Sequence, residues 1–106
     1  MKGPAMSVPV RLQLSRKRGF SLAAISHRLN NLDAVVVARP SKWGNPFGLD
    51  QYGRQEAVKL YRRHIQGKLA SGDLNLSDLR GKNLACWCAP EVACHADVLL
   101  ELANRR

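Results

Sequence analysis

Residues 84–103 read LACWCAPEVACHADVLLELA and give the strongest indication of fold in the chain. Leu84–Cys88 is a short apolar run that stops before a proline, which is typical of a buried strand. His95–Asn104 has the apolar spacing of a helix packed against a core. The stretch therefore predicts a strand, a turn and a helix in succession. All three cysteines and one of the three histidines lie in this segment.

Upstream, two further strands and two further helices are predicted. Val10–Leu14 alternates apolar and polar residues like a half-buried strand, and Ala34–Ala38 is apolar and β-branched, which predicts a strand buried on both faces. Ser21–Asn31 is predicted as a short helix and Gln55–Leu69 as a longer one. The apolar face of the first helix would consist of Leu22, Ile25 and Leu29.

This order of elements predicts an α/β fold. We expect a small single-domain sandwich in which helices flank a short parallel or mixed sheet, a minimal Rossmann-like arrangement. A chain of 106 residues has room for one core. Residues 1–9 are predicted to be a flexible arm and residues 10–106 the single domain.

The chain is strongly basic. It has 17 Lys and Arg against 8 Asp and Glu, a formal charge of +9 and an isoelectric point near 10.2. Such a charge attracts phosphate-bearing partners. The apolar runs are too short to cross a bilayer, and Met1–Arg18 lacks the apolar core of a secretory leader. We therefore expect a cytoplasmic location, no membrane partner and no structural disulfide.

Three interpretations of the cysteine turn are open. In the first, Cys86, Cys88, Cys94 and His95 bind zinc, although the cysteine and histidine pairs are more closely spaced than in most zinc sites. In the second, the turn is an anion or nucleotide pocket, with Cys94 at a helix N-terminus as a candidate nucleophile beside His95. In the third, the cysteines are core residues, which suits Cys86 best. Asp97 is expected to cap the helix.

The polar loop RPSKWGNPF, residues 39–47, directly follows the predicted strand Ala34–Ala38. It would therefore lie at the carboxyl end of a strand, where α/β proteins bind ligands. Either Trp43 or Phe47 could instead fill the core beneath the loop. We expect the loop and the cysteine turn to form one basic pocket for a phosphate-containing small molecule. The predicted ligand contacts are Arg39, Ser41, Lys42, Trp43, Asn45, Cys88 and His95, with Cys94 and His95 as candidate catalytic residues.

The motifs at residues 39–47 and 86–99 resemble those of the domain-of-unknown-function family 4326, whose members are small proteins of bacteria and their phages. The resemblance spans about residues 10–104 and includes the basic segment RKRGF at residues 16–20. It implies that the two motifs form one site and that the host cell is a bacterium or a phage-infected one. It implies no particular reaction.

Two other functions are open. The first is a zinc-supported module that binds nucleic acid through two basic clusters. Its contacts would be Arg11, Arg16, Lys17, Arg18, Arg62 and Arg63. The second is a phage protein that binds a host factor through its basic surface. Zinc is the one metal that the residues suggest as a cofactor.

Overall fold

Three short parallel strands form the sheet in the computed structural model, which describes residues 8–39, 41–89 and 91–104. They are β1 (Arg11–Gln13), β2 (Ala34–Val36) and β3 (Asn83–Cys86), in the spatial order β1-β3-β2. Leu84 of β3 lies opposite Arg11 of β1 and Val35 of β2. Because all three strands run the same way, their carboxyl ends meet at one edge of the sheet.

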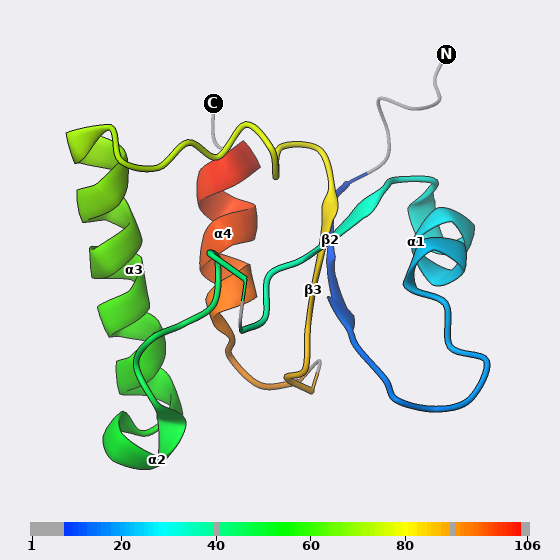
Figure 1. Cartoon of the computed structure of the whole chain (residues 1–106), viewed down its shortest axis with the longest axis horizontal. Coiled ribbons are helices and arrows are strands. Elements are labelled where there is room, and N and C mark those ends of the chain that lie inside the picture. Colours follow the sequence, from blue (N-terminus) through cyan, green and yellow to red (C-terminus); the bar gives the residue numbers. More distant parts are fainter. Residues whose placement is uncertain (1–7, 40, 90, 105–106) are drawn as a thin grey trace.

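Helices cover both faces of the sheet (Figure 1). Helix α1 (Leu22–Asn30) lies on one side, and α3 (Arg54–Ser71) and α4 (His95–Asn104) lie on the other. A single turn, α2 (Leu49–Tyr52), precedes α3. The predicted α/β sandwich is confirmed, with a parallel sheet. Of the predicted N-terminal arm, residues 1–7 lie outside the described residues.

The helix ends follow from the residues that occupy them. The Ser21 hydroxyl caps α1 by accepting a hydrogen bond from the Ala24 N–H at 3.2 Å, and Asn31 ends this helix in the left-handed conformation. Gly72 ends α3 with a φ of 81°, which glycine adopts without steric cost. Among the described residues, no helix is long and apolar enough to cross a membrane.

The strand buried on both faces is β3, not β2 as the sequence predicted. All four β3 residues are buried, whereas Val36 of β2 is 42% exposed. The reason is the strand order, because β3 inserts between the two earlier strands and leaves β2 at an edge. The β2 strand also ends at Val36, two residues before the predicted end, although Val37 and Ala38 are buried.

The predicted apolar face of α1 is also wrong. Ile25 and Leu29 are exposed, and the residue of α1 that is fully buried is Ser26. Its hydroxyl donates to the Leu32 carbonyl and accepts a hydrogen bond from the Asn83 amide at 2.7 Å. Helix α1 therefore docks through polar contacts, because a buried asparagine at the start of β3 requires partners there.

Asn83 connects three elements. Its Oδ1 accepts from the Val10 N–H at 3.0 Å and from Asn30 Nδ2 at 2.9 Å. Its Nδ2 donates to Ser26 Oγ and to Asn30 Oδ1 at 2.8 Å. One fully buried side chain thus ties the start of β3 to α1 and to the residue before β1.

The apolar core lies between the sheet and the pair α3 and α4 (Figure 1). Tyr61 and Ile65 of α3 pack with Leu99 of α4 and with Leu84 of β3. Of the apolar residues that α3 turns toward the core, Tyr61 and Ile65 are buried, while Val58 and Leu69 are partly buried. This core holds α4, and therefore its N-terminus, at a fixed position beside the end of β3.

Replacing Asn83 with alanine should lower the free energy of unfolding by about 3 kcal/mol, because the Ser26 hydroxyl, the Asn30 amide and the Val10 N–H all lose a buried partner. Urea denaturation measures this change. Gln66→Ala, at an exposed position on α3, is the control and should stay within about 0.5 kcal/mol of the wild type. An Asn83→Ala protein as stable as the control would show that this network does not hold the fold.

Candidate ligand-binding site

A cavity of about 190 Å³ opens at the carboxyl edge of the sheet. The loop after β2 lines it with Arg39, Asn45 and Phe47, and the turn after β3 lines it with Trp87 and Cys88. The start of α4 contributes Cys94 and His95. The structure therefore brings the two sequence motifs together, as predicted.

Arg11 holds the cysteine turn in place. Its Nη2 donates to the carbonyl oxygens of Ala89 and Val92 at 2.9 and 2.8 Å, and its Nη1 lies 3.3 Å from Asp97 Oδ2. The same carboxylate oxygen accepts from the Cys94 N–H at 3.1 Å, so Asp97 caps α4 as predicted. The Arg11 side chain is 9% exposed. Arg11, one of the residues predicted to contact nucleic acid, thus directs its guanidinium to the cysteine turn.

His95 connects α4 to the residue after β2. Its Nε2 lies 2.8 Å from the Val37 carbonyl oxygen, which can only accept, so Nε2 carries a proton. Its Nδ1 lies 3.6 Å from Cys94 Sγ, and the ring packs edge-on against Tyr61 with centroids 5.0 Å apart. His95 lines the cavity but is largely buried, and its Nε2 is engaged by the Val37 carbonyl.

The three thiols lie together at the floor of the cavity. The Sγ atoms of Cys86, Cys88 and Cys94 are all within 4.8 Å of one another, and those of Cys86 and Cys94 are 3.0 Å apart. Cys86 and Cys94 are buried, and Cys88 is half-buried. Cys86 is the last residue of β3, Cys88 lies in the turn after it, and Cys94 directly precedes α4, so the turn brings the three sulfurs together.

The contacts within the cluster favour a thiolate at Cys94. A hydrogen bond from the Cys86 thiol, aided by His95 and by the Ala96 N–H, lowers the pKa of Cys94 to about 3 despite its burial. The same bond to Cys94, together with burial, raises the pKa of Cys86. Burial also raises the pKa of Cys88, against the opposing effect of Arg54. Of the three cysteines, Cys94 is therefore the one whose negative form its neighbours stabilise.

Arg54 belongs to the site, although the sequence analysis did not select it. As the first residue of α3, it directs Nη1 to the Ala93 carbonyl oxygen at 3.1 Å and to Cys88 Sγ at 3.5 Å. A cation in the first turn of a helix opposes the helix dipole. That unfavourable placement, at the end of a polar loop, was a signal available in the sequence.

Three residues of the 39–47 loop were predicted to contact the ligand but do not line the cavity. Trp43 is 4% exposed and packs in the core, where its carbonyl accepts from the Tyr61 hydroxyl at 2.6 Å. Lys42 lies over the Trp43 ring at 4.9 Å, and the Ser41 hydroxyl accepts from the Trp43 N–H. Trp43 thus fills the core beneath the loop, and Phe47 is the aromatic residue of this loop that lines the cavity.

Asn45 shapes the loop around the cavity. Its Nδ2 donates to the Ala57 carbonyl of α3 at 3.2 Å, and its Oδ1 accepts from the Phe47 N–H at 2.9 Å. Next to it, Gly44 lies so close to Arg39 that a Cβ atom would stand 2.5 Å from Arg39 Cγ and 2.9 Å from Arg39 Cα. The loop can therefore fold back on Arg39 only with glycine at this position.

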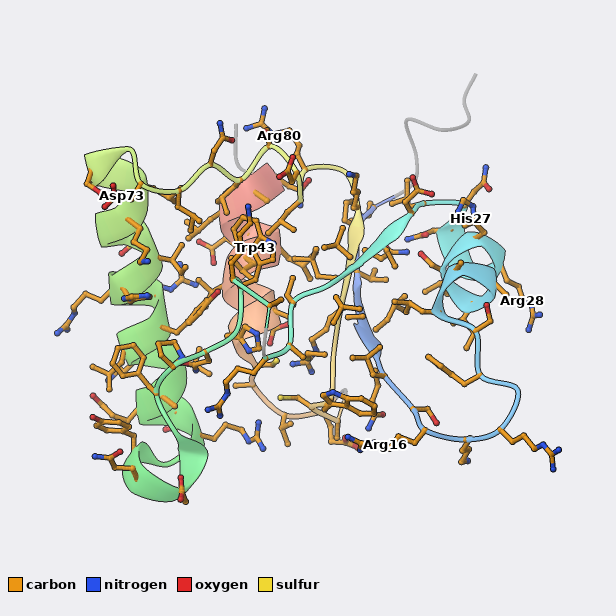
Figure 2. The ribbon with its side chains drawn as sticks, viewed as in Figure 1. Arg16, His27, Arg28, Trp43, Asp73 and Arg80 are labelled. Carbon is orange, nitrogen blue, oxygen red and sulfur yellow. The ribbon has the colours of Figure 1, made fainter. Side chains whose placement is uncertain are left out.

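The predicted basic residues do not form one surface. Arg62 makes a two-pronged ion pair with Glu101 at 2.7 and 3.2 Å, on the α3 and α4 side of the sheet. Arg16 stacks over Trp87 at 4.2 Å, at the same edge of the sheet as the cysteine turn (Figure 2). Lys17 and Arg18 are exposed beside it, and Arg63 is exposed on α3.

The fold and the site together define a small α/β protein with a cavity of thiols, arginines and aromatic rings at the carboxyl edge of a parallel sheet. The model of the family "Domain of unknown function (DUF4326)" matches residues 24–105, and the chain belongs to this family. The match includes every residue that lines the cavity.

Two viral relatives are similar to the chain. An "uncharacterized 12.4 kDa protein in nrdA-td intergenic region" of Enterobacteria phage T4 is 34% identical over 74 residues, which is 67% of this chain and 68% of the phage protein. An uncharacterized protein of Acanthamoeba polyphaga mimivirus is 38% identical over 72 residues, 58% of this chain and 52% of its own length. No solved structure matches the chain.

Gly44→Ala should lower the free energy of unfolding by about 1–3 kcal/mol, because the new methyl group collides with Arg39 and forces the loop outward. Gly67→Ala is the matched control. Gly67 lies inside α3 with open space around its Cα, so alanine there should raise stability by up to about 1 kcal/mol. Thermal unfolding of both variants shows whether the two changes in stability have opposite signs. Equal effects would show that the loop does not need the close approach.

Proposed function

We propose that the cavity binds the phosphate-bearing part of a nucleotide or of another phosphate-containing small molecule. The observation that carries this proposal is that two arginines, Arg39 and Arg54, line the same cavity from different elements. The planar guanidinium group matches the oxygens of a phosphate and stays charged at every physiological pH. The net charge of +9 adds a long-range attraction for anions.

The other lining residues favour a ligand with a flat ring. Phe47 and Trp87 offer aromatic surfaces, and Val58 and Ala38 add apolar contact. A volume of about 190 Å³ is below the roughly 300–1,000 Å³ of pockets that enclose a whole drug-sized ligand. The cavity would therefore hold one end of a mononucleotide and leave the other end in solvent. Such ligands are abundant in the cytoplasm, where we place the protein.

Binding fits the geometry better than nucleophilic attack by Cys94. The Cys94 side chain is buried, it is hydrogen-bonded to Cys86, and a negative sulfur repels an anionic ligand unless arginine lies between them. Arg54 lies 3.5 Å from Cys88 Sγ, where its charge offsets negative charge on the thiol cluster. In this proposal, the arginines bind the phosphate, while Cys94 and His95 shape the floor of the cavity.

One observation favours a second candidate, a nucleic acid whose end nucleotide enters the cavity. Arg16 lies over the cavity residue Trp87, and the exposed Lys17 and Arg18 follow it. These three cations could contact neighbouring phosphates of a strand. Arg11 and Arg62 take no part in this version, because Arg11 bonds the cysteine turn and Arg62 pairs with Glu101.

Arg39→Ala and Arg54→Ala should each weaken binding of adenosine monophosphate at least about tenfold, which corresponds to about 1.4 kcal/mol. Isothermal titration calorimetry measures this affinity. Adenosine, which lacks the phosphate, should bind all three proteins equally. Arg63→Ala, an exposed cation on the same helix as Arg54, is the control and should bind like the wild type.

Adenosine monophosphate affinity that survives both substitutions would contradict the proposal, as would an equal loss in the Arg63→Ala control. Circular dichroism and urea unfolding of each variant separate a loss of binding from a loss of fold. The second candidate predicts instead that a short oligonucleotide binds more tightly than the mononucleotide and that Arg16→Ala removes this difference.

A further inference from the structure

We propose that Cys86, Cys88 and Cys94 bind one zinc ion at the floor of the cavity. Each zinc–sulfur bond is about 2.3 Å long, so two sulfurs on one ion are about 3.8 Å apart in tetrahedral geometry and at most about 4.6 Å apart. The three Sγ atoms here lie within 4.8 Å of one another. The end of β3 and the start of α4 thus bring three thiols close to the spacing that a single ion requires.

The chemistry of the donors selects the metal. All three are sulfur, which favours zinc or another thiophilic ion over magnesium or calcium. The Cys86 and Cys94 sulfurs, 3.0 Å apart, would need to separate by somewhat less than 1 Å to share an ion. Small rotations about the side-chain bonds supply that movement without displacing the backbone.

The surroundings suit a zinc–thiolate centre. Three thiolates and one divalent ion carry a net charge of −1, and the Arg54 guanidinium lies 3.5 Å from Cys88 Sγ, where it offsets that charge. Two of the cysteines are buried, so the ion would be shielded on the protein side. Such an ion would also fix the turn of residues 87–94 to the start of α4.

His95 is not part of this three-sulfur group. Its Nε2 is hydrogen-bonded to the Val37 carbonyl, and its Nδ1 lies 3.6 Å from Cys94 Sγ without coming within 4.8 Å of all three sulfurs. The fourth position on the ion would face the cavity, which all three cysteines line. A structural zinc site has four protein ligands, whereas a site that binds substrate leaves one coordination position to water or to the substrate. The inference stands on the thiols and does not depend on phosphate binding.

Elemental analysis and native mass spectrometry of the full chain test this inference, with the protein produced in zinc-supplemented medium and purified under reducing conditions without chelator. The expected result is one zinc ion per chain. Cobalt(II) in place of zinc should give the intense near-ultraviolet absorption of thiolate-to-cobalt charge transfer. Cys88→Ser should lose both signals while the protein stays folded, because Cys88 is only half-buried.

His27→Ala is the control, since His27 lies on α1 at a distance from the cysteine turn (Figure 2) and should leave zinc content unchanged. A folded, reduced protein without zinc and without a cobalt–thiolate band would overturn the inference. Full zinc content in Cys88→Ser, or an equal loss in His27→Ala, would overturn it too. If Cys88→Ser fails to fold, alkylation of the three thiols with and without added zinc decides: protection by zinc supports the site, and equal labelling contradicts it.

Discussion

Strand β3 pairs with a parallel neighbour on each side and is buried along its whole length, and the rest of the structure depends on that position. At its start, Asn83 bonds α1 and the residue before β1. At its end, Cys86 lies beneath the cavity. Because the strands are parallel, the loop after β2 and the turn after β3 leave the sheet at the same edge. The site is a consequence of this topology.

Internal polar contacts then give the edge its shape. Arg11 bonds two carbonyls of the cysteine turn, and His95 bonds the residue that follows β2. Asn45 bonds the loop to α3. These polar groups therefore have partners within the protein. Arg39 and Arg54 remain the cationic lining residues contributed from outside the cysteine turn, and the phosphate proposal therefore rests on them.

Much of the fold could be predicted from the sequence, because strand and helix patterns are local. The three strands and the helices α1, α3 and α4 lie close to their predicted positions, whereas the short helix α2 was not predicted and β3 ends at Cys86, two residues before its predicted end. Strand order is not local, so the burial of β2 was overestimated and the exposure of Val36 was missed. The Ser26 contact was missed for the same reason, since nothing near residue 26 shows that Asn83 lies opposite.

The site was predicted in outline and not in detail. Because each motif follows a predicted strand, the sequence indicated correctly that the two motifs lie together. It did not indicate which aromatic side chain enters the core. Trp43 fills the core, and Phe47 lines the cavity. Charge alone could not separate a structural arginine such as Arg11 from a cavity arginine such as Arg54. Both arginines bond backbone carbonyls after folding, but the Arg11 side chain is largely buried, whereas Arg54 lines the cavity.

The most direct test of the account is a nuclear magnetic resonance titration of ¹⁵N-labelled protein with adenosine monophosphate. Binding at the cavity predicts saturable shifts of the backbone amides of Gly44, Asn45, Phe47 and Arg54 and of residues 87–89 and 91–94, which surround the cavity. It predicts small shifts along α1 on the far side of the sheet. Shifts confined to the basic turn at residues 15–19, or no saturable shifts at all, would contradict it.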